Sequence, residues 1–170
     1  EGGTHGEAPP YGLTAPAGGA ALSMQRYLAL HGGSSEKLAA VPIQIREHAL
    51  RNPDALMKEP LTLAAHQASR RVVDPLRLFD CCLETDGAMA MVLTSAERAR
   101  DLDATPVHVT GFAMGSGPQL TAMTFYYGEE LGRTPNRWVA PELWRNTGLS
   151  PRDIDVVQLY DAFTPQIPLA

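Results

Sequence analysis

The residues best suited to chemistry in this sequence are Tyr160 and Asp161, which directly follow a short apolar run over residues 154–159. The phenol of Tyr160 can donate or accept a proton, and Asp161 can orient a neighbouring group or cap the helix that the next residues begin. An apolar run of this length predicts a buried strand, and open α/β sheets place their ligands at the carboxyl ends of strands. The sequence therefore indicates a site at Tyr160.

Cys81 and Cys82 are the other candidate nucleophiles. Adjacent cysteines cannot readily form an ordinary disulfide with each other, and no metal-ligand spacing surrounds them. Free cysteine is among the most buried residue types, and an apolar strand raises the pKa of a thiol. We therefore expect two small, buried packing residues without a catalytic role, in a reducing cytoplasm.

No cluster of metal ligands is apparent in the sequence. His31, His48, His66 and His108 are scattered, without the spacing or the carboxylate partners that indicate a metal. We expect these histidines at the surface or at helix ends, and we expect no metal and no tightly bound cofactor.

The charge and hydrophobicity of the sequence limit the kinds of partner that we expect. There are 14 basic against 19 acidic residues, a net charge of −5, and no basic run that could neutralise a row of phosphates, which argues against nucleic acid. No apolar stretch approaches the roughly 18 residues of a membrane span, and no basic-then-apolar leader is present. The chain begins without Met and stops early in an expected helix, so we expect a segment of a longer subunit.

Helices dominate the expectations for the first part of the chain. Residues 1–19 are rich in glycine and proline and are expected to be irregular. Apolar spacing predicts a helix from Ala20 to the Gly32-Gly33 stop, and a second helix from Ser34 or Ser35 to before Asn52. Pro42 should kink or divide that second helix, and Thr62 can cap a short helix that runs toward Ser69.

From Leu76 onward the pattern alternates between strand and helix. The apolar or β-branched runs at residues 88–93, 107–112 and 154–159 predict strands, while residues 96–102 and 141–146 predict helices. This alternation predicts an α/β fold, with a sheet flanked by helices.

Three blocks of sequence, residues 38–70, 74–97 and 148–163, together resemble the thiolase superfamily and, within it, the sterol-carrier and lipid-transfer-protein branch. The resemblance covers most of the chain from about Ala20 onward. It implies a partial thiolase-like fold, in which residues 1–73 are part of the loop domain and residues 74–170 are the first part of the carboxyl-terminal half. The family's nucleophilic cysteine and its histidine-glycine motif would then lie outside this sequence.

The stretch Tyr160-Asp161-Ala162-Phe163 departs from the Asn-Glu-Ala-Phe of ordinary thiolases and from the His-Asp-Cys-Phe of the sterol-carrier type. It is similar to that of lipid-transfer-protein aldolases, which cleave the side chain of steroid acyl-CoA thioesters without a cysteine nucleophile. The resemblance implies a retro-aldol lyase in which coenzyme A is part of the β-hydroxyacyl substrate. It also implies a homodimer and a partner protein with a zinc ribbon and an OB-like fold.

On that resemblance Tyr160 is the expected acid-base group, and Ala162 and Phe163 are expected near the pantetheine arm of the substrate. Each position has a structural alternative, because Tyr160 could pack its ring at a strand end and Phe163 could be a core residue of the following helix. Two other functions also stay open: a thiolase or acyl-CoA acyltransferase of the same fold, and a non-catalytic lipid-binding or scaffold subunit.

Overall fold

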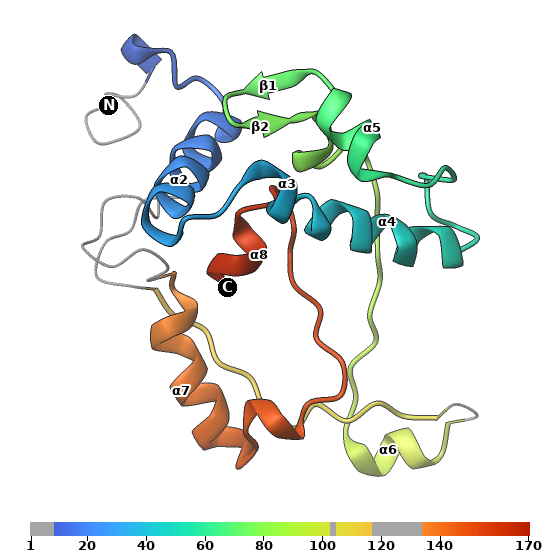
Figure 1. The fold of residues 1–170 in the computed structure, drawn as a ribbon. Helices are drawn as coiled ribbons and strands as arrows, with labels where there is room; N and C mark the ends of the chain where they lie inside the picture. Colours follow the sequence, from blue (N-terminus) through green and yellow to red (C-terminus); the bar gives the residue numbers. More distant parts are fainter. Residues whose placement is uncertain (1–8, 103–104, 117–133) are drawn as a thin grey trace.

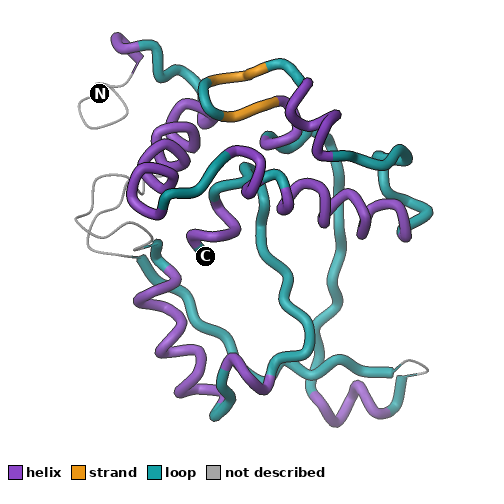
Figure 2. Tube along the Cα trace, viewed as in Figure 1, coloured by secondary structure: helices purple, strands orange, loops and turns teal. Residues whose placement is uncertain are grey.

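The computed structural model describes residues 9–102, 105–116 and 134–170. Helices α2 to α5, a β-hairpin and α8 gather in one group, and α6 and α7 lie at the other end of the molecule (Figure 1). Two long extended segments connect the groups (Figure 2). The first group contains the buried core and the candidate site. A short 3₁₀ helix, η1 (Pro9–Tyr11), precedes it.

Helix α2 (Pro16–His31) supplies the centre of the core through its buried residues Ala20, Ala21 and Met24. It begins before the predicted Ala20 because Pro16 occupies the first helical turn, where its missing N–H is not needed. It ends at the predicted glycine. Gly32 adopts the left-handed conformation, with φ of 63°, and its N–H donates to the carbonyl of Leu28. This is the usual glycine cap of a helix carboxyl end.

The predicted second helix is divided, as Pro42 led us to expect. It forms α3 (Ser35–Leu38) and α4 (Ala40–Arg51), which separate at Ala39. The break places Pro42 in the first turn of α4, where the proline nitrogen has no helical hydrogen bond to lose. The side chain of Ser34 caps α3 by accepting a hydrogen bond from the N–H of Lys37 at 3.3 Å.

A short helix and a hairpin continue the chain. Thr62 caps α5 (Leu63–Ala68) as predicted, by accepting from the N–H of Ala65 at 3.1 Å. The antiparallel strands β1 (Arg71–Val73) and β2 (Leu76–Arg77) then form a two-stranded sheet around a cis Asp74-Pro75 peptide bond. A 3₁₀ helix, η2 (Leu78–Asp80), follows. The sequence patterns gave no indication of this hairpin.

The core joins the two ends of the chain. Ala162 and Phe163, just before α8 (Gln166–Leu169), pack in one buried cluster with residues of α2, α3 and β2. The buried members are Ala20, Ala21, Met24, Leu38, Leu76, Ala162 and Phe163. Residues more than a hundred positions apart are therefore held together by one small apolar core.

The second group of helices contains α6 (Ala96–Arg100), α7 (Asn136–Thr147) and the 3₁₀ helix η3 (Pro151–Asp153). Ser95 caps α6 as predicted, through the N–H of Arg98 at 3.3 Å. Helix α7 was predicted only from Pro141, but it begins five residues earlier and includes that proline. Gly148 ends α7 in the left-handed conformation, with φ of 69°.

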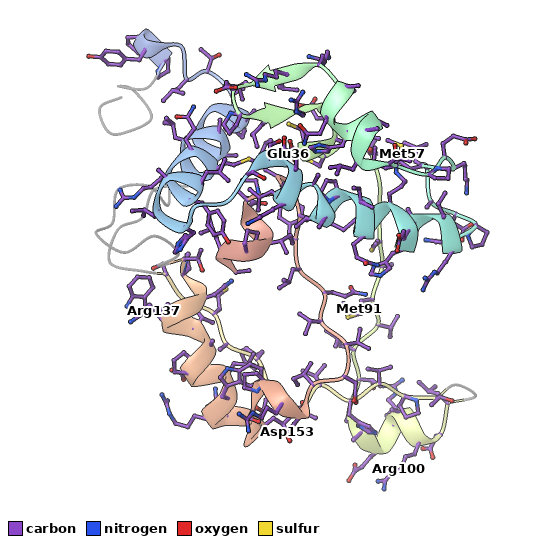
Figure 3. The ribbon with its side chains drawn as sticks, viewed as in Figure 1. Glu36, Met57, Met91, Arg100, Arg137 and Asp153 are labelled. Atoms are coloured by element: carbon purple, nitrogen blue, oxygen red, sulfur yellow. The ribbon has the colours of Figure 1, made fainter. Side chains whose placement is uncertain are left out.

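The three predicted strands of the carboxyl-terminal part do not form a sheet within the described residues. None of the three segments is a strand: residues 88–93, 107–112 and 154–159. Figure 2 shows the first and last of them within long extended paths. The prediction that they are buried strands is wrong for this structure. Met89 is 100% exposed, Val156 is 78% exposed, and Met91, which lies on the first extended segment (Figure 3), is 81% exposed.

The physical reason is that strand formation is not local. A strand needs neighbouring backbone to bond to, and an apolar run on both faces is buried only when layers cover it. In the described part of the chain, β1 and β2 of the hairpin are the only strands that have a hydrogen-bonded neighbouring strand.

We predict that Leu76→Ala lowers the free energy of unfolding by about 2–5 kcal/mol, because it opens a cavity at a completely buried core position. Denaturant unfolding of the full-length protein that carries this sequence measures the change. Leu56→Ala is the matched control, since Leu56 is 71% exposed and the same deletion should cost less than about 0.5 kcal/mol there. Equal losses at the two positions would contradict the core described above.

Candidate active site

A groove of about 1000 Å³ lies beside the core, between the start of α2, one face of α4, residues 78–84 and residues 160–163. Most of its lining side chains are apolar, among them Ile45, Leu78 and Phe79. Grooves of this size with an apolar wall and a few polar groups are typical of small-molecule sites. This groove is therefore the candidate site for the predicted chemistry.

The structure brings the predicted site residues to this groove. Tyr160, Asp161, Ala162 and Phe163 all line it, and so do Cys81 and Cys82 from the facing segment. Tyr160 ends the extended segment that starts after η3, and it is 78% exposed. Its phenol is therefore available to a molecule in the groove, although the strand predicted to precede it is not formed.

Ala162 and Phe163 have two roles at once. They are 3% and 8% exposed and belong to the buried core cluster, yet they also form part of the groove wall. The two alternatives open for Phe163, a core residue or a wall of the binding site, are thus compatible. One side of the segment packs on α2 and the other side faces the groove.

A short stretch of backbone pairing, between residues distant in the sequence, holds this segment against residues 80–82. Cys81 and Phe163 form an antiparallel bridge, and the N–H of Cys82 donates to the carbonyl of Ala162 at 3.0 Å. Successive side chains in extended backbone point to opposite sides. Cys81 is consequently half-buried beside the core, whereas Cys82 is exposed.

The two cysteines are therefore not equivalent, and the prediction that both are buried is wrong for Cys82. Burial raises the pKa of the Cys81 thiol to about 11, and the negative charge of Asp80 adds to the effect. Its Sγ also donates weakly to the carbonyl of Arg77 at 3.6 Å. A thiol with so high a pKa has almost no thiolate at neutral pH and is a poor nucleophile.

A buried polar cluster that the sequence did not reveal includes Asp80, which lies in the chain between the groove-lining residues Phe79 and Cys81. The side chains of His66 and Asp80 are completely buried, and His66 Nε2 lies 3.1 Å from Asp80 Oδ1. The expectation that His66 lies at the surface or serves only as a helix cap is wrong. Asp80 is fourteen positions away, so no helical spacing could have identified it as the partner.

Two arginines bring positive charge to the groove. Arg46 and Arg70 both line it. The guanidinium of Arg46 donates to the carbonyl of Glu59 at 2.7 Å, and its central carbon lies 5.7 Å from the ring centroid of Phe79, a cation–π contact. An apolar groove edged by guanidinium groups suits a ligand with an apolar body and an anionic end.

Within the described residues, no three His, Cys, Asp or Glu side chains come together as a metal site requires. The same part of the chain contains no helix with the length and apolarity to cross a bilayer.

Two known proteins with similar sequences are named as a lyase and an aldolase. The chain is 45% identical over 158 residues to the 17-hydroxy-3-oxo-4-pregnene-20-carboxyl-CoA lyase of Mycobacterium tuberculosis, a match that covers 92% of this chain and 41% of the relative. It is 43% identical over 160 residues to a steroid side-chain-cleaving aldolase of Thermomonospora curvata, covering 93% of this chain and 41% of that protein. The chain thus spans about two fifths of the length of these curated relatives. No protein-family model matches it.

More distant relatives include thiolases. The benzoylsuccinyl-CoA thiolase subunit BbsB of Thauera aromatica is 34% identical over 145 residues, which cover 85% of this chain and 37% of the subunit. Among solved structures, the Ltp2-ChsH2(DUF35) aldolase superposes with a TM-score of 0.92 at 40% identity, over 98% of this chain and 45% of that chain. The chain therefore has a thiolase-like fold and belongs to the thiolase superfamily, with the steroid side-chain-cleaving aldolases of the lipid-transfer-protein branch among its homologues.

Proposed function

We propose that the full-length protein containing this chain is a carbon–carbon lyase that cleaves the side chain of a steroid-derived β-hydroxyacyl-CoA by a retro-aldol reaction. The observation that carries the proposal is the exposed phenol of Tyr160 at an apolar groove, in a chain more than 40% identical to two proteins named as such a lyase and aldolase. The groove suits an apolar substrate body, and no cysteine nucleophile is needed.

The proposed reaction requires proton transfer at two positions. The β-hydroxyl loses its proton, the bond between the α- and β-carbons breaks, and its electron pair passes into the thioester as an enolate. The β-carbon becomes a ketone, and a proton added to the α-carbon completes the shorter acyl-CoA. Tyr160 can take part in two ways: its anion can accept the proton of the β-hydroxyl, or its hydroxyl can stabilise the enolate by donating a hydrogen bond to the enolate oxygen.

Ala162 and Phe163 are the proposed contacts to the pantetheine arm of the substrate. Both are rigidly packed by the core, so the wall that they form is preorganised and costs little ordering entropy on binding. Coenzyme A enters as part of the substrate, and we propose no tightly bound cofactor.

We also propose a homodimer that works with a second protein carrying a zinc ribbon and an OB-like fold. The support is that the similar solved structure is an aldolase named for two components, Ltp2 and ChsH2(DUF35). The assignment to the cytoplasm is part of the same proposal, and the free state of Cys81 and Cys82 is compatible with a reducing compartment.

Tyr160→Phe tests the proposed role of the phenol. The variant keeps the ring and deletes only the hydroxyl, so kcat should fall by roughly a hundredfold or more, in line with the loss of one acid-base or oxyanion group. The measurement uses the full-length enzyme with its partner and a β-hydroxyacyl-CoA steroid. Tyr11→Phe is the matched control, because Tyr11 is 86% exposed and is not among the residues that line the groove. Near-normal turnover of Tyr160→Phe would remove the main support for an aldolase.

The Cys81→Ala/Cys82→Ala double variant separates the aldolase from a thiolase that uses a cysteine of this segment. We expect kcat to stay within a fewfold of the parent, with the larger effect on stability, because half-buried Cys81 packs against the core. Loss of turnover with the fold intact would show that a thiol takes part.

Alkylation of the unmodified protein reports the state of Cys81 directly. With its pKa raised to about 11, the Cys81 thiolate forms as the pH rises toward that value, so labelling should speed up roughly tenfold per pH unit between pH 8 and 10. Mass spectrometry of peptides after iodoacetamide treatment follows the reaction. Rapid, pH-independent labelling of Cys81 above pH 7 would contradict the raised pKa.

A further inference from the structure

Within the described residues, the segment that carries Tyr160 is hydrogen-bonded to other parts of the chain on its downstream side only. Before it, residues 154–159 are extended and have no strand partner in the described part of the chain. After it, three hydrogen bonds connect residues 162–164 to residues 80–82. Besides the bond from Cys82 to Ala162, the N–H of Thr164 donates to the carbonyl of Asp80 at 3.0 Å, and Thr164 Oγ1 donates to Asp80 Oδ1 at 2.8 Å. These bonds form an anchor that fixes the backbone directly following Tyr160 and so helps to place its side chain.

Asp80 is the side chain at the centre of the anchor. Asp80 is 2% exposed. Its Oδ2 accepts a hydrogen bond from the N–H of Arg77 at 2.8 Å, and its Oδ1 lies within hydrogen-bond distance of both Thr164 and His66. A buried carboxylate is tolerated only where donors replace the lost water. Here the donors come from three separate parts of the chain, so the carboxylate is satisfied only when all three are in place.

The orientation of His66 is fixed by its own neighbours. Gln67 Nε2, which can only donate, lies 3.2 Å from His66 Nδ1 and 3.2 Å from Ser35 Oγ. Nδ1 is then the acceptor, and the proton on Nε2 points at Asp80. The ring then donates to the carboxylate, and a continuous hydrogen-bonded path connects Ser35 of α3, His66 of α5, Asp80 and Thr164.

We propose that Asp80 is a positioning residue, which sets the location of the Tyr160 phenol in the groove through its hydrogen bond from Thr164. This inference rests on the proposed function, because it assigns the cluster a role in the step that Tyr160 performs. Displacement of a reacting group by about 1 Å can cost a hundredfold in rate, so an anchor four residues from Tyr160 can control turnover without touching substrate.

Thr164→Val tests this connection in the full-length enzyme with its partner. Valine has nearly the shape of threonine, so the variant removes the hydrogen bond to Asp80 Oδ1 and leaves the backbone bond in place. We expect kcat to fall about tenfold or more with KM changed by less than about threefold, because the interaction acts on the chemical step and not on general binding. Thr164→Ser keeps the hydroxyl and should restore most of kcat.

The double variant Tyr160→Phe/Thr164→Val separates positioning from general loss of structure. If Thr164 acts through Tyr160, the second substitution should lower kcat by less than about twofold once the phenol is gone, whereas independent effects would multiply. Thr147→Val is the matched control for stability, since its Oγ1 donates to the carbonyl of Leu143 within α7, away from the groove. Should Thr164→Val fail to fold, Thr164→Ala is measured in the same cycle.

The outcomes are distinguishable. A normal kcat in Tyr160→Phe would overturn the proposed function and this inference together. A low kcat in Tyr160→Phe with a normal kcat in Thr164→Val would overturn the inference alone. Multiplicative losses in the double variant, or no recovery in Thr164→Ser, would also overturn it.

Discussion

The buried carboxylate of Asp80 is the group on which the described structure depends most. An ionised carboxylate loses its hydration when it is almost completely buried, and only hydrogen bonds from the protein can offset that loss. The donors are the ring of His66 on α5, the backbone of Arg77 beside η2, and Thr164 just before α8. Because these donors are spread over the chain, the hydrogen bonds to the carboxylate also fix how α5 and the carboxyl-terminal segment lie together.

The same junction explains why the groove wall is rigid. Ala162 and Phe163 pack on α2 through the apolar core and are bonded to residues 80–82 through the backbone. Their free side faces the groove together with Tyr160 and Cys82. Core packing and wall shape are therefore set by the same atoms, so that substitutions at Phe163 must change both stability and the groove. Tyr160, which has no such packing, is the position where chemistry can vary at little structural cost.

The likeness to a solved aldolase is compatible with the lack of a central sheet in the part of the chain that the structure describes. The backbone path follows that structure with a TM-score of 0.92 over 98% of this chain, which amounts to 45% of the solved chain. The segments at residues 88–93 and 154–159 follow extended paths, and their apolar side chains are largely exposed. Extended conformation can thus be present without the hydrogen-bonded ladder that defines a strand, because the ladder needs neighbouring strands beside these segments.

The sequence by itself determined the features that a few adjacent residues control. Gly32 ends α2, Ser34, Thr62 and Ser95 cap their helices, and Pro42 divides α3 from α4, because each effect acts within one helical turn. Tyr160 was singled out by its residue type and by family resemblance, and its catalytic role stays a proposal. Only the tertiary structure decided the pairing of His66 with Asp80, the bond from Thr164 across 84 positions and the exposure of Cys82. It also decided that the three apolar runs find no strand partner among residues 9–102, 105–116 and 134–170. Those outcomes depend on which distant segments meet, and no local pattern of side chains encodes that.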